Sequence, residues 1–304
     1  MSLLSVEDLT VHFHSRNGII EAVRNLSFIL DYGETLAIVG ESGSGKSVAS
    51  YSLLDLIPKP PGKIEAGKAI FNGSDLLTLE TLDLQKIRGN EIAIIFQDPM
   101  SSLNPYLTIG EQLVEPIIYH KKKSRGEAKE LALSMLTEVG LNGSDNKFDC
   151  FPHELSGGMQ QRAMIAMALI TKPKLLICDE PTTALDVTTQ AQIIRLIHKI
   201  QEKYKIAVIF ISHDLGVVAG IADKIIVMKD GEAIETGITN DIFYNPKTKY
   251  TKKLLSSIPR GEKEEKNSIS KKVLLRVDNL VKHHPVNQDT FSWQICKSSR
   301  RCIF

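Results

Sequence analysis

An eight-residue stretch, GESGSGKS at residues 40–47, combines glycines, hydroxyls and one lysine in the spacing GxxxxGK[ST]. Glycines let a backbone curl so that successive N–H groups point inward, and the start of a following helix adds partial positive charge. In such a loop the lysine reaches the β- and γ-phosphates of a nucleotide and the last hydroxyl can bind Mg²⁺. The sequence therefore predicts a nucleoside triphosphate site at Gly40, Glu41, Ser42, Gly43, Ser44, Gly45, Lys46 and Ser47.

Two carboxylates further along the chain could complete this site. The segment LLICDE at residues 175–180 reads as a buried strand that ends in Asp179 and Glu180. Ligands of open α/β sheets bind beyond the carboxyl ends of the strands, so Asp179 is expected to hold Mg²⁺ and Glu180 to orient or deprotonate the attacking water. Taken alone, an apolar run followed by two acids could equally be a plain strand end.

A second candidate anion site lies at LSGGMQQR, residues 155–162. Ser156, Gly157 and Gly158 precede a helical run, so backbone N–H groups and the helix dipole should face outward at a helix start. Ser156 is also expected to serve as an ordinary N-cap, but that role does not account for the paired glycines. The chain thus carries two half-sites for phosphate.

The hydrophobic pattern indicates which elements position these segments. Short apolar or alternating runs predict strands, and 3.6-residue periodicity predicts helices. The expected strands are 3–13, 19–30, 34–39, 68–73, 91–96, 174–178, 206–211 and 224–228, and the expected helices are 46–57 and 188–203. From about 108 to 170 the periodicity is helical, without a convincing strand. The pattern predicts an α/β core interrupted by a helical insert.

Composition excludes several classes of protein. Lys and Arg number 37 against 36 for Asp and Glu, so the net charge of +1 gives no general reason to expect nucleic acid as a partner. The four cysteines form neither a disulfide framework nor a CxxC pair. The longest apolar runs are far shorter than the roughly 20 residues of a membrane span. We expect a cytosolic chain that reaches a membrane only through a partner.

Taken together, the motifs resemble those of ATP-binding cassette (ABC) ATPases. The family's six elements are matched in order by GESGSGKS (Walker A), Gln97 in IIFQDP (Q-loop), LSGGMQQR (signature), LLICDE (Walker B), Ala184-Leu185-Asp186 (D-loop) and His213 in ISHD (switch histidine). The resemblance implies a mixed sheet with flanking helices, an antiparallel β subdomain and a helical subdomain inserted at about 100–170, all within an ATPase domain at 1–259.

The resemblance also implies ATP and Mg²⁺ as ligands and assigns the site residues. Glu180, His213 and Gln97 would be catalytic, and Ser47, Gln97 and Asp179 would hold Mg²⁺. In this family two cassettes pack head to tail, so Ser156, Gly157, Gly158 and Asp186 would complete the nucleotide site of a partner cassette. Phe13 is similar to the aromatic residue that stacks on adenine, although a strand phenylalanine packed on the core is an equal alternative.

The sequence that surrounds these motifs resembles that of the ATPases of bacterial dipeptide and oligopeptide importers. The matching segments include RGNEIAIIFQDPMSSLNPYLTIGEQL and FPHELSGGMQQRAMIAMALI. The resemblance implies a peripheral subunit on the cytoplasmic face of the bacterial inner membrane. Its partners would be integral-membrane permeases, a second cassette as homodimer or paralogue, and an extracytoplasmic solute-binding protein. Cys296 and Cys302 are not expected to bind an iron–sulfur cluster, which some members of the branch carry.

Two other functions remain open from the sequence. The first is a soluble ABC ATPase of translation or DNA repair, although the compact helical insert lacks the sustained heptads of the repair type. The second is an inactive truncated product. A charged linker is expected at 260–272, and LLRVDNLVKHH at 274–284 repeats LLSVEDLTVHF at 3–13. We therefore expect 273–304 to be the truncated start of a second cassette, with the repeat failing at the polar segment 296–301.

Overall fold

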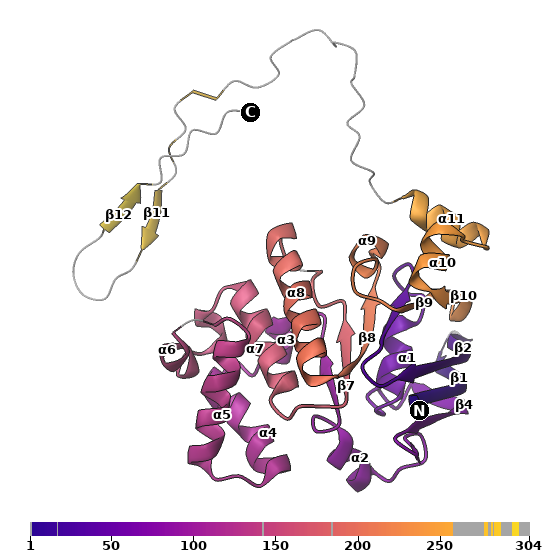
Figure 1. The fold of residues 1–304 in the computed structure, drawn as a ribbon, viewed down its shortest axis with the longest axis horizontal. Helices are drawn as coiled ribbons and strands as arrows, with labels where there is room; N and C mark the ends of the chain where they lie inside the picture. The colour runs from indigo at the N-terminus through magenta and orange to yellow at the C-terminus, as the bar shows by residue number, and fades with distance from the viewer. Residues whose placement is uncertain are drawn as a thin grey trace. The chain divides into compact units, whose positions relative to one another are not determined.

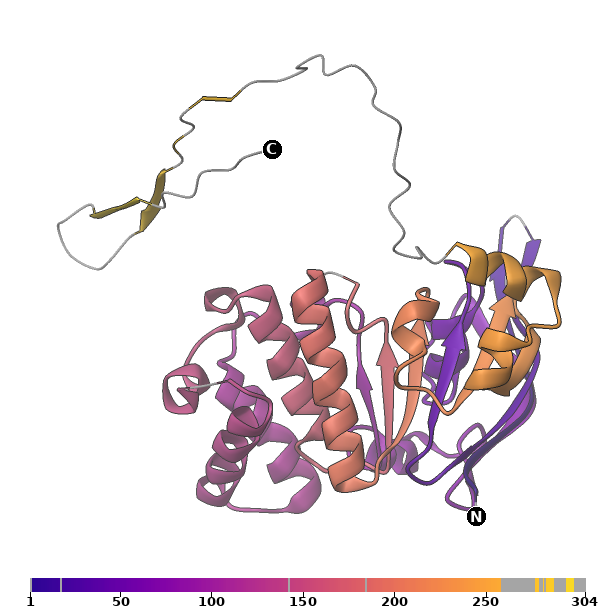
Figure 2. The ribbon, with the colours of Figure 1, turned by 45° about the horizontal axis from the view of Figure 1, so that its top comes forward.

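The computed structural model describes residues 2–16, 18–141, 143–183, 185–257, 277–278, 281, 283–286 and 294–297. It divides into two compact units, Met1–Pro259 and Arg260–Phe304. The first unit holds every candidate site residue, and Figures 1 and 2 show its elements in two views.

A six-stranded sheet forms the centre of the first unit, in the order β10-β9-β3-β8-β7-β6. Its strands are β3 (Thr35–Val39), β6 (Ile92–Ile95), β7 (Leu175–Asp179), β8 (Ala207–Ser212), β9 (Lys224–Lys229) and β10 (Glu232–Ile238). The neighbours from β9 to β6 pair in parallel, whereas β10 pairs antiparallel with β9. The expected mixed sheet is therefore confirmed.

Both faces of this sheet are buried, which explains the continuous apolar runs of its strands. Along β3, Ala37 and Val39 belong to one hydrophobic cluster, and Leu36 and Ile38 belong to the other. In the first cluster the sheet packs against the helical insert and α8 (Val187–Tyr204). In the second it packs against α1 (Lys46–Ser52) and the antiparallel sheet.

The antiparallel sheet has the strand order β2-β1-β4-β5. Its members are β1 (Ser2–Ser15), β2 (Gly18–Asp31), β4 (Gly62–Phe71) and β5 (Ser74–Asp75). The predicted pairing of the first two strands is confirmed, and β1 also pairs with β4. In Figure 1 this sheet lies at the opposite side of the six-stranded sheet from the insert.

The insert between β6 and β7 consists of helices joined by turns and loops and contains no strand among its described residues, as the periodicity predicted. It consists of α3 (Pro99–Ser102), α4 (Ile109–Lys121), α5 (Arg125–Glu138), α6 (Ser144–Phe148), a short 3₁₀ turn (Pro152–Glu154) and α7 (Gly157–Leu169). Thr108 and Ser124 form capping boxes with the N3 glutamates of α4 and α5, so the two longest insert helices before α7 begin at strong local signals.

Four further short helices lie outside the insert in the described part of the chain, and α1 is shorter than its predicted length. They are α2 (Thr81–Ile87), α9 (Leu215–Val218), α10 (Thr239–Tyr244) and α11 (Lys249–Ser256). Helix α1 was expected to reach residue 57 but ends at Ser52. The chain turns back there, with Leu56 N–H donating to the Tyr51 carbonyl and Asp55 at a left-handed φ of 53°. No described helix is both long and apolar enough to cross a bilayer.

The second unit contains one described hairpin, β11 (His283–Val286) paired antiparallel with β12 (Gln294–Lys297). Cys296 and Lys297, which begin the segment where the repeat was expected to fail, lie in β12, and the assignment of 273–304 to a second cassette stays a prediction. Most of the repeated segment 274–284, the linker 260–272 and Cys302 lie outside the described residues.

Candidate active site

The candidate site residues follow four adjacent strands of the parallel sheet. Gly40 follows β3, His213 follows β8, Asp179 ends β7, and Gln97 comes two residues after β6. Because β3, β8, β7 and β6 are parallel neighbours in this order, their carboxyl ends lie along one edge. The topology thus brings together segments that the sequence keeps more than 100 residues apart.

The glycine-rich loop follows β3 and opens α1. Gly45, the N-cap residue of α1, has a φ of 96°, and an added Cβ would lie 2.1 Å from the Ala22 carbonyl oxygen. A Cβ on Gly40 would lie 2.2 Å from the Met228 carbonyl oxygen. Side chains at these two positions would collide with backbone, so glycine is required for the loop to close against β2 and β9.

Lys46 is a buried cation held by neutral oxygens. Its Nζ donates to the carbonyl oxygens of Gly40 at 2.9 Å and Glu41 at 2.8 Å, and it forms no ion pair within the described residues. Burial lowers the pKa of Lys46 below its ordinary value, and the charges of Glu180 and Asp179 oppose that shift. A phosphate would supply the anionic partner that this ammonium group lacks.

Asp179 is also buried, at 3% exposure, and two hydroxyls donate to its carboxylate. Ser47 Oγ lies 2.8 Å from Oδ1, and Tyr51 OH lies 2.6 Å from Oδ2. Burial and the contact with Asp179 raise the pKa of Tyr51 well above its ordinary value, so the phenol stays a neutral donor at pH 7. The Ser47 hydroxyl and the Asp179 carboxylate are hard oxygen ligands of the type that suits Mg²⁺.

Three side chains contact one carboxylate oxygen of Glu180, two of them as hydrogen-bond donors. Its Oε2 lies 3.1 Å from Gln97 Nε2, 2.9 Å from Thr183 Oγ1 and 3.2 Å from His213 Nδ1. The Glu180 backbone has a left-handed φ of 45°, and its N–H donates to the Ile211 carbonyl of β8. None of these three contacts involves Oε1.

Lys46, Ser47 and Glu180 border a cavity of about 1050 Å³, whereas Asp179 is not among its lining residues. Its lining combines loop residues 40–43 and 45–48 with Gln97, Glu180 and His213, and a wall from the β1–β2 hairpin adds Ile19, Ile20, Glu21, Ala22 and Arg24.

Phe13 is not among the lining residues. It packs against the second hydrophobic cluster, and its ring approaches Gly62 of β4. Ile19 and Ile20, each 60% exposed, are the apolar side chains of that wall.

The signature residues lie at the start of α7 and do not line the cavity. Ser156 occupies the N-cap position, but its side chain makes no capping hydrogen bond, contrary to the expected ordinary cap. Asp186 caps α8, because its carboxylate accepts from the backbone N–H groups of Thr188 and Thr189 and from the Thr189 hydroxyl. These bonds lower the pKa of Asp186. Ala184 lies outside the described residues.

Sequence reasoning missed three contributors to the site. Tyr51 lies one helical turn after Ser47, so its position on the Ser47 face of α1 was a usable signal. Thr183 lies three residues after Glu180 and is not among the predicted site residues. Ile20, the cross-strand partner of Phe13, lines the cavity although Phe13 does not, and no sequence signal marked it.

Comparisons with known proteins agree with this geometry. Residues 23–183 match the family model described as ABC transporter. The chain is 52% identical over 260 residues to the oligopeptide transport ATP-binding protein OppD of Bacillus subtilis, covering 86% of this chain and 73% of that protein. It is 51% identical over 258 residues to the dipeptide transport ATP-binding protein DppD of Bacillus subtilis, covering 85% and 77%.

A solved structure gives the same result at the level of the fold. The dimeric ATP-binding cassette MJ0796, in a post-hydrolysis state bound to ADP and Pi, superimposes with a TM-score of 0.69 at 31% identity, covering 78% of this chain and 98% of that one. The family model spans more than half of the chain, and the relatives align over most of both proteins. The chain therefore belongs to the ABC transporter family, as one of its ATP-binding cassettes.

Proposed function

We propose that this chain hydrolyses ATP to ADP and phosphate, and that hydrolysis drives the uptake of peptides or peptide-like solutes through partner membrane permeases. The observation that carries the proposal is the convergence of Gln97, Thr183 and His213 on one oxygen of Glu180, beside a phosphate loop. The solute class rests on the similarity to oligopeptide and dipeptide transport ATP-binding proteins.

The residues present fit a magnesium nucleotide. Lys46 is buried and has no anionic partner in the described part of the chain, and the glycine loop is too closely packed to admit side chains. Ser47 and Asp179 offer hard oxygen ligands next to the loop, and Gln97 could add an amide oxygen. When bound, Mg²⁺ would neutralise charge that develops on the phosphates during transfer.

We assign the chain's own residues the following roles. Lys46 and the backbone N–H groups of the loop hold the phosphates, while Ser47 and Asp179 hold the cation. Glu180 Oε1 accepts a proton from the attacking water, because Oε2 is already engaged by Gln97, Thr183 and His213. Gln97 and His213 fix the carboxylate and face the cavity, where they can contact the water and the γ-phosphate.

A complete site requires a second cassette in this proposal. Ser156, Gly157 and Gly158 present backbone N–H groups and an uncapped hydroxyl at the start of α7, but none of them borders this chain's own cavity. A head-to-tail pair would bring these groups to the phosphates of the partner's nucleotide. The related cassette that was solved as a dimer supports this arrangement. The second cassette would be another copy or a paralogue.

The permease would dock beside the helical insert. An apolar pocket of about 260 Å³ lies there, lined by residues of β6, α4 and α7 that include Ile94, Pro116 and Met167. Phe96 also lines it and is 38% exposed. We propose that a short cytoplasmic segment of a permease fills this pocket. The chain would then lie on the cytoplasmic face of the inner membrane, and an extracytoplasmic binding protein would deliver the solute.

The test of hydrolysis is Glu180→Gln, with ATPase turnover and ATP binding measured separately. General-base catalysis contributes on the order of 10²–10⁴-fold, so turnover should fall within that range while ATP affinity is kept. ATP should then accumulate in a stable dimer, visible by sedimentation. Glu202→Gln is the matched control, because Glu202 also faces a histidine, His198, but on the exposed surface of α8. Unchanged turnover in Glu180→Gln would refute the assignment.

Transport is tested in cells of a strain that lacks its oligopeptide transport ATP-binding protein. Expression of this chain should restore growth when an amino acid that the cells cannot make is supplied only as a peptide. Expression of the Glu180→Gln variant should not restore growth. If the chain hydrolyses ATP but does not restore peptide uptake in these cells, the transport proposal is overturned and the hydrolysis proposal stands.

A further inference from the structure

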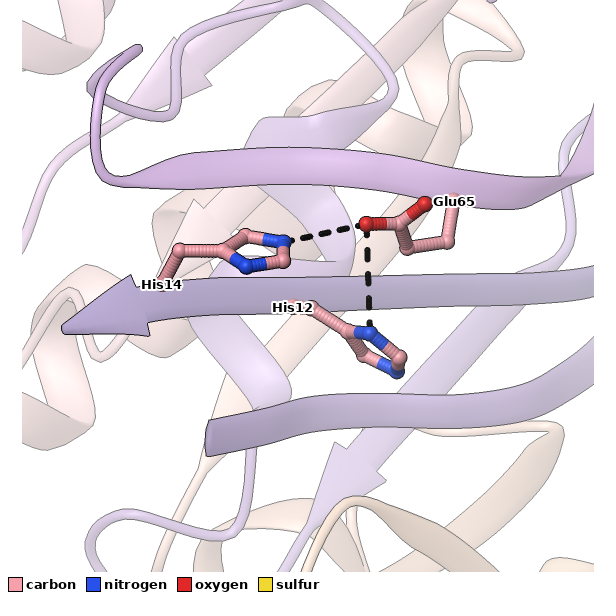
Figure 3. A group of neighbouring side chains, drawn as sticks. All are labelled: His12, His14 and Glu65. Atoms are coloured by element: carbon pink, nitrogen blue, oxygen red, sulfur yellow. Dashed lines mark hydrogen bonds and ion pairs between the residues drawn. The ribbon is translucent and has the colours of Figure 1, made fainter. Parts of the chain in front are cut away.

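Two histidines and a glutamate meet on the antiparallel sheet, outside the nucleotide cavity. His12 and His14 are two residues apart on β1, so their side chains lie on the same face of the strand. Glu65 lies on the neighbouring strand β4. Figure 3 shows both imidazole rings directed toward Glu65. One donor atom from each of the three side chains lies within 4.8 Å of the other two.

Both imidazoles approach the same carboxylate oxygen. His14 Nε2 lies 3.1 Å and His12 Nδ1 lies 4.0 Å from Glu65 Oε1 (Figure 3). Around a tetrahedral Zn²⁺ with bonds of about 2.0–2.1 Å, neighbouring ligand atoms are about 3.4 Å apart. The observed separations are close to this value, so small rotations of the side chains would place all three donors around one ion.

The cluster is open to solvent. The exposed fractions of the side chains are 21% for His12, 46% for His14 and 25% for Glu65. An ion can therefore enter, and water can occupy the fourth position of a tetrahedral site. The nearest competing cation is Lys63, which lies opposite His12 in the β1–β4 register. Its Nζ contacts the other oxygen of Glu65, Oε2, at 2.8 Å, and leaves Oε1 to the histidines.

We propose that His12, His14 and Glu65 form a binding site for a divalent transition-metal cation, with Zn²⁺ as the best match. Two imidazoles and one carboxylate suit Zn²⁺ and its neighbours in the first transition row, whereas Mg²⁺ and Ca²⁺ prefer oxygen ligands throughout. The site is therefore chemically distinct from the Ser47 and Asp179 pair of the nucleotide cavity.

The bound ion would link β1 to β4 next to the hairpin wall of the nucleotide cavity. In the β1–β2 register, His12 pairs with Glu21 and His14 pairs with Ile19, and both of these partners line that cavity. A crosslink made by the ion would be present only in the folded state, so Zn²⁺ should raise the temperature of unfolding.

The experiment is Zn²⁺ binding to the full chain after removal of divalent ions, measured by equilibrium dialysis with elemental analysis. We expect the double variant His12→Gln/His14→Gln to lose at least tenfold in Zn²⁺ affinity, and to lose the rise in unfolding temperature that Zn²⁺ gives the original chain. Co²⁺ should give the visible absorption of a tetrahedral site in the original chain only. Unchanged Zn²⁺ affinity in the double variant would overturn the proposal.

Two further variants sharpen the result. His198→Gln removes an exposed histidine that also faces a glutamate, on α8, and should leave Zn²⁺ binding unchanged. Lys63→Gln removes the cation that competes for Glu65 and should tighten Zn²⁺ binding several-fold; an unchanged or weaker affinity would contradict Glu65 as a ligand. Circular dichroism and ATP binding confirm that each variant folds.

Discussion

Glu180 is held by both its backbone and its side chain. Its φ of 45° is unusual for a residue with a Cβ, and such conformations cost roughly 1–3 kcal/mol. They persist where surrounding contacts fix them, and here these contacts are the hydrogen bond to the Ile211 carbonyl and three side-chain contacts with Oε2. Strain of this kind fits a carboxylate that is positioned for chemistry.

Tyr51→Phe tests how Asp179 is oriented. The variant removes one of two hydroxyl donors from a buried carboxylate, so the free energy of unfolding should fall by about 1–3 kcal/mol. Because Asp179 is then held only through Ser47, half-maximal ATPase activity should need more Mg²⁺. Thermal denaturation and a Mg²⁺ titration of turnover measure the two effects.

The matched control for Tyr51 is Tyr204→Phe. Tyr204 OH donates to Glu138 at 2.7 Å, far along the chain from the nucleotide loop. Its loss should cost stability without changing the Mg²⁺ requirement. If Tyr51→Phe behaved like this control, Tyr51 would have a purely structural role.

At the scale of elements, one buried carboxylate ties the carboxyl-terminal helices to the central sheet. Glu235 of β10 accepts from the backbone N–H groups of Lys247 and Thr248, at the turn that leads into α11. Burial would raise the pKa of Glu235, but the hydrogen bonds from Lys247, Thr251 and Thr248 outweigh it and lower the pKa to about 2.

Glu235→Gln should therefore change how stability depends on pH. The folded-state pKa is below the ordinary value of 4.5, so the ionised carboxylate stabilises the fold above pH 4.5, and this contribution is lost as the pH falls toward 2. We expect the variant to be less stable by about 2 kcal/mol at pH 7, with the difference shrinking between pH 4.5 and 2. Urea denaturation across this range measures it.

Glu127→Gln provides the control for solvent exposure. The side chain and backbone of Ser124 lower the pKa of Glu127 to about 2 as well, but Glu127 lies on the surface of α5. Water screens its interactions, so the Glu127 variant should show a much smaller pH-dependent difference. Equal effects in both variants would show that burial does not matter for Glu235.

At the scale of the whole molecule, the two predicted phosphate-binding features lie at different places on one chain. The loop at residues 40–47 borders the large cavity, and the signature residues at the start of α7 do not. A pairwise complementation experiment follows from this separation. Lys46→Ala damages the loop of a chain, and Ser156→Arg blocks its signature, so each variant alone should lose ATPase activity.

Mixing the two variants should restore part of the activity. In a head-to-tail heterodimer both defects fall in one site, and the other site combines an intact loop with an intact signature. Turnover of the mixture, compared with each variant alone, is the measurement. No recovery in a mixture that demonstrably forms heterodimers would contradict the shared site.

The sequence predicted strands with a clear apolar pattern better than elements without one. Alternating or continuous apolar runs identified β1, β2, β3, β7, β8 and β9, because burial of one or both faces requires those patterns. The two-residue strand β5 and the seven-residue helix α2 were missed, since so few residues show no periodicity. The helix α1 was overextended, because the turn at residue 55 depends on a left-handed φ at Asp55 that the pattern does not reveal.

The sequence by itself determined the glycine-rich loop, the carboxylates at the end of β7 and the order of the motifs, because each is a local pattern of residue types. Only the tertiary structure decided which of these residues meet. Ser47 and Tyr51 reach Asp179, and Gln97 and His213 reach Glu180, because β3, β8, β7 and β6 are neighbours in one sheet. Strand pairing likewise places His12 and His14 beside Glu65. Sheet order and register arise from packing across the whole chain, and a local sequence pattern does not contain that information.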